Sequence, residues 1–262
     1  MTATVDLNAD MGEGWGAYAM GDDAALLDVV TTANVACGFH GGDPLVMHRT
    51  ITAAKARGVE VGGHPGFLDP WGFGRRRLPD ESPSDVEKLV VYQLGAIRAV
   101  AAFAGHAVTH VKPHGTLNTM ANTDADLAAA IVRAVKAVDP GFVLVAMPGT
   151  ELERAGERAG LRVAREIFAD RAYGDDGNLV PRKVPGAMIH DVEAAAERVL
   201  RMVLDGEVVA LSGKRLRVGA DTICVHGDNP AAIAMARAVR SRLEAAGVSV
   251  APLTRVLSAK GR

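Results

Sequence analysis

The sequence contains little cysteine and few aromatic residues. Only two of its 262 residues are cysteines, Cys37 and Cys224, and both lie within apolar runs. Two thiols so far apart are more typical of core positions than of a disulfide, and such sparse use fits a reducing compartment. Aromatic residues make up 4% of the chain, which argues against a surface for stacking single-stranded nucleic acid.

An excess of charge of one sign is also missing. The 29 basic residues nearly balance the 31 acidic ones, so the formal net charge is -2. A nucleic-acid-binding protein normally has a strong basic excess. The first residues do not resemble a signal peptide, and no run approaches the ~18 apolar residues of a membrane span. We therefore expect a soluble cytoplasmic protein without a nucleic-acid or membrane partner.

Three common catalytic motifs are missing as well. The chain lacks the HExxH sequence of many metalloproteases, the GxSxG elbow of serine hydrolases and the GxxxxGK[ST] phosphate loop. If the protein uses ATP, a standard phosphate loop does not hold it.

Short β-type runs alternate with longer helical patterns along the chain. We expect strands at residues 4–8, 33–37, 60–63, 108–112, 143–146, 162–167 and 222–226. Helices are expected at residues 22–30, 43–57, 84–104, 123–138, 150–159, 189–204 and 230–246, with Ser84 and Glu87 forming a capping box. A hairpin is expected at 207–218, and long polar loops at 64–83 and 169–186.

This alternation predicts an α/β protein in which helices cover a mainly parallel sheet. Seven or eight such units in one chain favour a closed or nearly closed barrel, and an open doubly wound sheet is the alternative. No linker or change in composition divides residues 1–262, so we expect one domain.

Polar residues follow the carboxyl ends of six expected strands, where α/β proteins build their sites. The candidates there are Asn8, Asp10, His40, Asp43, His64, Lys112, His114, Asp170, Arg171, His226 and Asp228. Arg75 and Arg76 lie in the long loop 64–83. Each has a structural alternative: Asn8 and Asp10 can form turns, Asp43 can cap a helix, and the arginines can be a solvated charge run. Six such strand ends together predict an active site.

Carboxylates and imidazoles together support two kinds of chemistry. They can bind zinc or a related divalent metal, whose bound water is a nucleophile at neutral pH. Without a metal, Asp10 would act as a base, and a histidine or Lys112 would stabilise a developing oxyanion. The residues alone leave both alternatives open.

Seven segments of the chain carry long motifs in a fixed order. They are DLNADMGE at 6–13, ANVACGFHGGDP at 33–44, GHPGF at 63–67, GFGRR at 72–76, VKPHGTLN at 111–118, EIFADRAY at 166–173 and CVHGDN at 224–229. These motifs resemble those of the LamB/YcsF family, the family of 5-oxoprolinase A subunits. The resemblance implies ATP-dependent opening of 5-oxo-L-proline to L-glutamate, in a complex with subunits B and C. It also implies an irregular β/α barrel of the seven-stranded type, similar to the glycoside hydrolase/deacetylase superfamily.

The resemblance also suggests roles for individual residues. Deacetylases of that superfamily bind a metal through an aspartate of the first strand and two later histidines, which match Asp10, His64 and His114 here. His40 and His226 are the reserve ligands. The catalytic candidates are Asp10, His40, His64, Lys112 and His114. The candidates for binding substrate or phosphate are Asn8, Asp43, Arg75, Arg76, Asp170, Arg171, His226 and Asp228.

Two other functions compete with this interpretation. One is a stand-alone metal-dependent deacetylase or amidase that acts on a carbohydrate-like substrate, because fold does not fix function. The other is a non-catalytic scaffold subunit of the same complex. Since the chain has no standard phosphate loop, we expect partner subunits to supply or share the ATP site.

Overall fold

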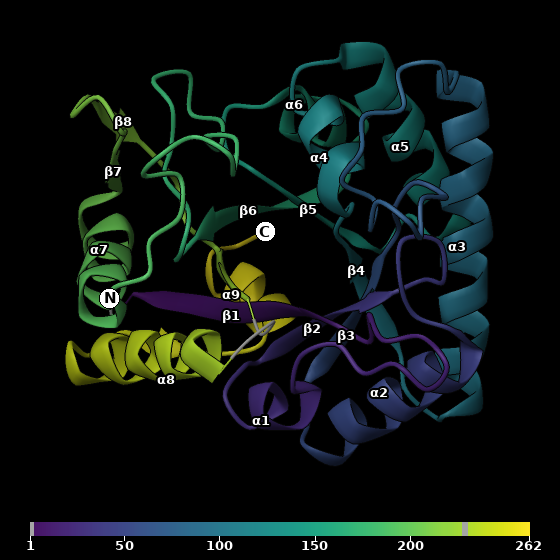
Figure 1. Ribbon diagram of the computed structural model, residues 1–262, viewed down its shortest axis with the longest axis horizontal. Helices are drawn as coiled ribbons and strands as arrows, with labels where there is room; N and C mark the ends of the chain where they lie inside the picture. The colour runs from purple at the N-terminus through teal and green to yellow at the C-terminus, as the bar shows by residue number, and fades with distance from the viewer. Residues whose placement is uncertain (1–2, 227–229) are drawn as a thin grey trace.

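Seven parallel strands close into a barrel in the computed structural model, which describes residues 3–226 and 230–262 (Figure 1). Around the barrel the order is β1, β2, β3, β4, β5, β6, β9, and β9 pairs again with β1. Their bounds are Thr4–Met11, Thr32–Ala36, Glu60–His64, Val108–Val111, Val143–Ala146, Arg162–Phe168 and Thr222–Val225. The predicted barrel is therefore confirmed, and the open doubly wound sheet was the wrong alternative.

Helices surround the barrel and short elements complete the fold (Figure 1). The helices are α1 Asp23–Leu27, α2 Pro44–Ala56, α3 Pro83–Phe103, α4 Gly115–Ala121, α5 Ala125–Val138, α6 Glu151–Arg158, α7 Val192–Asp205, α8 Pro230–Ala245 and α9 Leu253–Ala259. β7 Glu207–Val209 and β8 Arg215–Arg217 form the predicted antiparallel hairpin, and β10 Ser249–Val250 pairs in parallel with the first residues of β1. Within the described ranges no helix is long and apolar enough to span a membrane.

The structure corrects one local prediction and adds two short helices that were not predicted. Helix α3 begins at Pro83 and is capped by Ser82, whose hydroxyl accepts a hydrogen bond from the Asp85 N–H; the predicted Ser84 capping box was wrong. Proline fits a first helical position because it has no N–H to leave unpaired. The short helix α4 and the α9 segment were not predicted, because helices of seven residues depend on tertiary packing for their stability.

The inside of the barrel is unusually polar. Alternation along β1 directs Val5, Leu7 and Ala9 toward the helices, and Asp6 and Asn8 toward the barrel axis. Cys37 and Cys224 are free and buried, as predicted. The more usual barrel interior consists of layered branched apolar side chains.

Hydrogen bonds between strands hold this polar interior together. The Asn8 side chain donates to Thr222 Oγ1 at 2.6 Å and accepts from Asn34 Nδ2 at 2.7 Å. Asn34 Oδ1 in turn lies 2.9 Å from Nε2 of His110. The His110 ring fits only because Gly62 faces it: a Cβ at Gly62 would lie 2.1 Å from Nε2. A glycine in β3 therefore makes room for an imidazole of β4.

Helix α9 closes the barrel at the amino ends of the strands. Leu253 and Leu257 join an apolar cluster with Val143, Val145 and Ala164 of β5 and β6. Farther along the chain, Lys260 and Arg262 pair with Asp221, just before β9. With this end filled, a ligand enters from the carboxyl ends of the strands.

Asp6 makes the stability of the barrel dependent on pH. Burial raises its pKa to about 7, although Thr222, Thr31 and Thr32 donate hydrogen bonds that oppose the rise. The folded state then binds more protons than the unfolded chain between about pH 4 and 7, so stability falls as the pH rises through this window. From pH 5 to pH 8 we expect wild type to lose about 2–3 kcal/mol more than Asp6→Asn, measured by urea unfolding. Asp80→Asn, at an exposed loop position, serves as control, and equal pH dependence in wild type and Asp6→Asn would contradict the prediction.

The proposal of a single domain is tested by limited proteolysis. We expect the first cuts within the loops 64–83 or 169–186, with the remaining fragments staying associated, because the strands on either side pair within one barrel. Size-exclusion chromatography of the nicked protein measures this association. Two fragments that separate and fold independently would refute the proposal.

Candidate functional site

The carboxyl ends of the strands open into a cavity of about 980 Å³. Asp10 of β1, His64 of β3, and Lys112 and His114 after β4 lie in its wall, together with His226 after β9. Asp10 and His226 also have ligand atoms within 4.8 Å of each other and of Cys224 Sγ. Ionisable residues from four strands are thus brought together in one cavity.

Lys112 occupies the centre of the barrel, surrounded by acceptors. Its Nζ donates to Asp10 Oδ1 at 2.9 Å and to Cys224 Sγ at 3.2 Å, and lies 2.8 Å from Glu166 Oε1. Burial opposes the charge, but these neighbours raise the pKa of Lys112 well above its usual value. Burial likewise opposes ionisation of Asp10, yet His64 and Lys112 hold its pKa well below the usual value. The site therefore contains a fixed ammonium–carboxylate pair at neutral pH.

His64 and His114 are each oriented by a backbone carbonyl. His64 Nδ1 lies 2.6 Å from the Lys112 oxygen, and His114 Nε2 lies 2.8 Å from the Phe73 oxygen. A carbonyl only accepts, so both nitrogens carry protons. In the neutral rings, His64 Nε2 and His114 Nδ1 are then unprotonated, and they face each other at 3.0 Å. Two facing lone pairs call for a shared proton or a cation between them.

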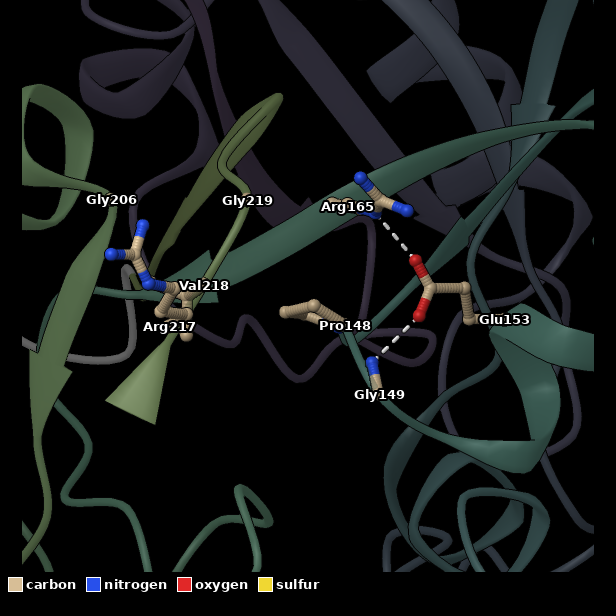
Figure 2. A pocket seen from close by; sticks show the side chains of 8 residues that line it. All are labelled: Pro148, Gly149, Glu153, Arg165, Gly206, Arg217, Val218 and Gly219. Atoms are coloured by element: carbon tan, nitrogen blue, oxygen red, sulfur yellow. Dashed lines mark hydrogen bonds and ion pairs between the residues drawn. The ribbon is translucent and has the colours of Figure 1, made fainter. Parts of the chain in front are cut away.

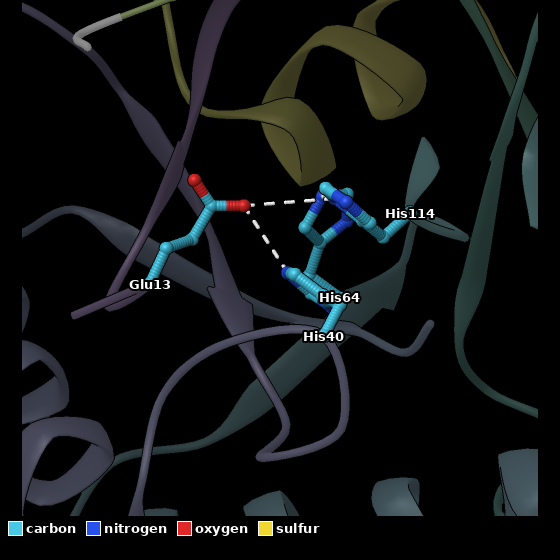
Figure 3. A group of neighbouring side chains, drawn as sticks. All are labelled: Glu13, His40, His64 and His114. Carbon is cyan, nitrogen blue, oxygen red and sulfur yellow. Dashed lines mark hydrogen bonds and ion pairs between the residues drawn. The ribbon is translucent and has the colours of Figure 1, made fainter. Parts of the chain in front are cut away.

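Glu13 and His40 complete this cluster (Figure 3). The Glu13 Oε1 atom lies 3.1 Å from His40 Nε2 and 3.5 Å from His114 Nδ1. Burial raises the pKa of Glu13, and it lowers the pKa of both His40 and His114. The His40 and His114 rings stack with their centroids 3.5 Å apart. Both imidazoles are consequently neutral at pH 7 and available as ligands.

The donor atoms of this cluster fit a divalent metal. His64 Nε2 lies 3.0 Å from His114 Nδ1 and 3.3 Å from Asp10 Oδ2, and Glu13 adds a carboxylate oxygen. Ligands about 2.0–2.2 Å from a tetrahedral zinc lie about 3.3 Å from one another, which is close to these separations. Metal-bound histidines also donate their other N–H to a carbonyl or carboxylate, as His64 and His114 do.

Loop 65–82 covers the histidines under tight steric limits. Phe73 has a φ of 53°, a conformation that costs energy for a residue with a side chain. This conformation directs its carbonyl to His114. A Cβ at Gly74 would lie 2.8 Å from atoms of both His40 and His114, and a Cβ at Gly66 would lie 2.7 Å from His40 Nδ1. The two glycines therefore allow the loop to pack directly on the imidazoles.

His226 and Asp170 form a second titratable pair. His226 Nδ1 lies 2.7 Å from Asp170 Oδ2. Although burial opposes its charge, Asp170 has a lowered pKa, because His226 and nearby arginines favour the carboxylate. A carboxylate that accepts from Nδ1–H leaves Nε2 free of a proton in the neutral ring. The ring lines the cavity, so this nitrogen is a candidate general base.

Besides Lys112, five basic residues line the cavity, and we call them together the cationic wall. They are Arg75, Arg77, Arg171, Arg182 and Lys183. Arg171 is buried, donates through Nη2 to the Val180 oxygen at 2.7 Å, and has an Nε with no hydrogen-bond partner among the described residues. Burial and then the nearby Arg182 lower the pKa of Arg171. Such crowding of like charges favours an anionic ligand.

Two predicted ligand-binding residues, Asp43 and Arg76, do not line the cavity. Asp43 caps α2, accepting from the Leu45 and Val46 N–H groups, and it also binds the Gly16 N–H. Arg76 pairs outside the cavity with Asp69.

Two further candidates lie below or beside the cavity. Asn8 is buried in the polar interior, where its Oδ1 lies 3.4 Å from Lys112 Nζ, so it supports the site from beneath. Asp170 contributes through His226. Asp228 lies outside the residues that the structure describes.

Sequence reasoning omitted Glu13 and Glu166 from the candidate residues. Glu13 is three residues after Asp10 and lies beyond the end of β1. Its position in the sequence therefore did not indicate that it contacts histidines from other strands. Glu166 precedes Phe168 by two residues in β6, and both face the barrel interior, near Lys112. The available signal was Glu166 itself, the single acidic residue in a strand whose side chains alternate between two faces.

A second hollow of about 390 Å³ lies at a distance from this chemistry, between the turn at Gly149 and the end of β8 (Figure 2). Two of its charged groups, Glu153 and Arg165, are already paired with each other. Glu153 forms an ion pair with Arg165 at 2.5 Å and accepts a hydrogen bond from the Gly149 N–H at 2.6 Å. This hollow has none of the histidines that mark the larger cavity.

Comparison with known proteins identifies the family. The LamB/YcsF family profile matches residues 5–258. The chain belongs to the LamB/YcsF family. It is 54% identical over 251 residues to the 5-oxoprolinase A subunit of Rhodopseudomonas palustris strain BisB5, covering 96% of this chain and 99% of that relative. The crystal structure of the lactam utilization protein from Thermus thermophilus is 51% identical, with a TM-score of 0.90 over 95% of this chain and 99% of that one.

More distant structures share the fold alone. Peptidoglycan deacetylase PdaC from Bacillus subtilis is 13% identical to this LamB/YcsF protein, with a TM-score of 0.51 over 99% of this chain and 92% of that one. The fold likeness to deacetylases expected from the sequence is therefore confirmed.

Metal content tests the assignment of the histidine cluster. We expect protein loaded with zinc and then dialysed to retain about one ion per chain, because Glu13, His40, His64 and His114 each offer a ligand atom within 4.8 Å of the others. Substituting His114→Ala should reduce zinc content by tenfold or more, while His190→Ala, at an exposed position, should leave it unchanged. Plasma emission spectrometry measures the zinc. Wild-type protein that retains no zinc would rule out the metal and leave the shared-proton alternative.

Proposed function

We propose that this chain is the A subunit of an ATP-dependent 5-oxoprolinase, a cytoplasmic enzyme that hydrolyses 5-oxo-L-proline to L-glutamate together with subunits B and C. The observation that carries the proposal is a single cavity whose lining contains Asp10, Lys112 and His226 together with the cationic wall. A small cyclic amide with one carboxylate matches these two sets of residues. The 54% identical relative, named as a 5-oxoprolinase A subunit, supports the same substrate.

Substrate orientation follows from charge. The carboxylate of 5-oxoproline pairs with Arg171, whose Nε lacks a partner among the described residues, and with Arg75. The lactam carbonyl then turns toward Lys112, whose ammonium stabilises negative charge on the carbonyl oxygen. The cationic wall thus selects the acid, and the Asp10–Lys112 pair acts on the amide.

The reaction requires activation because resonance makes a lactam carbonyl unreactive. Phosphorylation of its oxygen by ATP yields a better electrophile. Water then adds to the carbonyl carbon, the ring C–N bond breaks as the nitrogen takes a proton, and the phosphate remains on the new carboxyl group as an acyl phosphate. A second water hydrolyses this acyl phosphate, so that glutamate, ADP and phosphate result. His226, oriented by Asp170, takes the proton from water, and Asp10 orients that water.

The histidine cluster would contribute either a bound metal or a proton donor. His64 and His114, with Asp10 and Glu13, would hold a divalent metal, which when bound polarises an oxygen or lowers the pKa of water. His40 packs against His114 and contacts Glu13, so it supports the cluster. The proton on the departing nitrogen comes from His64 or His114 if no metal is bound.

One observation favours a second candidate function. The facing donor atoms of Asp10, His64 and His114 also suit a stand-alone metal-dependent amidase or deacetylase. Such an enzyme would cleave its amide without ATP. The remaining alternative, a non-catalytic scaffold, leaves the buried charges of Asp10, Lys112 and Glu166 without a purpose.

Reconstitution tests the proposed function. We expect little or no hydrolysis of 5-oxo-L-proline by this chain alone, and ATP-dependent hydrolysis once subunits B and C are added, measured as glutamate formed. ATP-independent cleavage of an acetylated sugar by the isolated chain would favour the second candidate instead.

Asp10→Asn tests the role of the first strand. The exchange is nearly isosteric and removes the charge that faces Lys112 and His64, so reconstituted activity should fall by about 10³-fold or more. Circular dichroism and co-purification with subunits B and C control for folding and assembly. Full activity of Asp10→Asn would show that the carboxylate is only structural.

A further inference from the structure

Four neighbouring strands each place one residue in a single row across the inside of the barrel. Asp10 of β1 is paired in register with Asn34 of β2. Asn34 is paired in turn with Gly62 of β3, and Gly62 with His110 of β4. Asn34 and His110 are completely buried, and neither of them lines the cavity. The row therefore joins the carboxylate of the site to two polar side chains that lie beneath it.

The missing side chain of Gly62 lets the row close. A Cβ at Gly62 would lie 2.1 Å from His110 Nε2, so any larger residue there would occupy the place of the imidazole. With glycine present, the ring of His110 reaches across β3, and its Nε2 lies 2.9 Å from Asn34 Oδ1. A residue of β4 thus contacts a residue of β2, although a whole strand separates them.

The hydrogen bonds along this row run in one direction only. An ionised carboxylate accepts and does not donate, so the amide nitrogen of Asn34 faces Asp10, with Nδ2 3.0 Å from Oδ1. The amide oxygen of Asn34 therefore faces His110, and Nε2 of that ring carries a proton. Burial and the charge of Lys112 lower the pKa of His110 to about 3, so the ring is neutral and its Nδ1 is unprotonated. The hydroxyl of Thr109, 3.0 Å away, can donate to this nitrogen.

Asn34 determines which oxygen of Asp10 faces the site. Oδ1 accepts two hydrogen bonds, from Asn34 Nδ2 and from Lys112 Nζ at 2.9 Å. Oδ2 is the oxygen that lies 3.3 Å from Nε2 of His64, which lines the cavity. An ammonium on a flexible stem donates in several directions, so Lys112 alone does not specify the oxygen that it binds. The Asn34 amide, held at its own oxygen by His110, favours one orientation of the carboxylate.

We propose that Asn34 and His110 are positioning residues: His110 holds the Asn34 amide, and Asn34 holds the Asp10 carboxylate with Oδ2 turned toward the reacting water. The inference rests on the proposed function, in which Asp10 orients that water, and it adds the two residues that orient Asp10. Neither residue lines the cavity, so their loss should lower kcat and leave KM unchanged. A displacement of about 1 Å at a reacting group can cost about 10²-fold in rate.

A matched pair of substitutions at His110 tests its contact with Asn34. In the chain reconstituted with subunits B and C, His110→Leu removes the donor and should lower the kcat for 5-oxo-L-proline by about 10²-fold, with KM within about twofold of wild type. His110→Gln places an amide N–H near the position of the lost Nε2–H and should keep kcat within about fivefold of wild type.

His106→Leu is the control for loss of a histidine hydrogen bond. His106 Nε2 lies 3.0 Å from the Val59 oxygen, just before β4 begins, and His106 does not line the cavity. The same chemical exchange there should leave kcat and KM unchanged. Thermal melting of each variant measures the folded fraction, to which kcat is normalised.

Asn34→Leu tests whether His110 acts through Asn34. This variant should also lower kcat by about 10²-fold, because Asp10 loses the same donor. Adding His110→Leu to Asn34→Leu should cause no further loss, because the effect of His110 passes through the amide that is already missing.

Nuclear magnetic resonance gives a readout that does not depend on activity. Long-range proton–nitrogen spectra of the chain labelled with ¹⁵N-histidine distinguish the two neutral tautomers of each ring. We expect His110, identified by the signals that His110→Gln lacks, to be protonated at Nε2 throughout the neutral pH range. The Nε2 signal should shift in Asn34→Leu, in which that N–H loses its acceptor.

Three outcomes would overturn the inference. They are a His110 ring protonated at Nδ1 alone, a kcat of His110→Leu no lower than that of His106→Leu, and additive losses of kcat in the double variant. The proposed function is judged separately. A wild-type complex that does not hydrolyse 5-oxo-L-proline would contradict the function, and the histidine spectra would still test the contacts. Hydrolysis by wild type with an unchanged kcat in His110→Leu and Asn34→Leu would contradict only the positioning role.

Discussion

The architecture depends on one buried charge, the ammonium of Lys112. An isolated charge inside a protein is costly, so the barrel interior must supply acceptors from several strands. Asp10 and Glu166 neutralise the ammonium, and Asn8 and Cys224 add polar contacts. These partners exclude the apolar layers that usually fill such a barrel. The polar interior of the barrel follows from this constraint. The position of the site at the carboxyl ends of the strands follows from it as well.

The histidine cluster shows how backbone geometry prepares side chains for chemistry. Two carbonyls fix the protons of His64 and His114 so that the unprotonated nitrogens face each other. One of those carbonyls belongs to Phe73, whose strained backbone is stable only because the surrounding loop packs tightly. The strained backbone at Phe73 thus helps to hold the unprotonated nitrogens of two histidines close to two carboxylates. This arrangement favours the binding of a cation or a proton.

Much of the fold could be predicted from periodicity and end signals. Alternating strands and helices predicted the barrel, and Asp43 with Pro44 predicted the start of α2. The same aspartate was also assigned to ligand binding, because sequence does not tell whether a helix cap faces a cavity. Glu13 and Glu166 were omitted for a related reason: contacts between strands depend on register and on barrel closure, which a single sequence does not report.

The sequence by itself determined the chemical inventory: which acids, imidazoles and cations follow which strands, and the family whose motifs contain them. Only the tertiary structure decided their pairing. Lys112 and Asp10 are more than a hundred residues apart, yet they meet because β1 and β4 lie in one closed barrel. Closure converts separate strand ends into one ring of side chains, and the resulting distances set the pKa values, the proton positions and the metal fit. Those quantities depend on separation in space, which residue spacing along a chain does not specify.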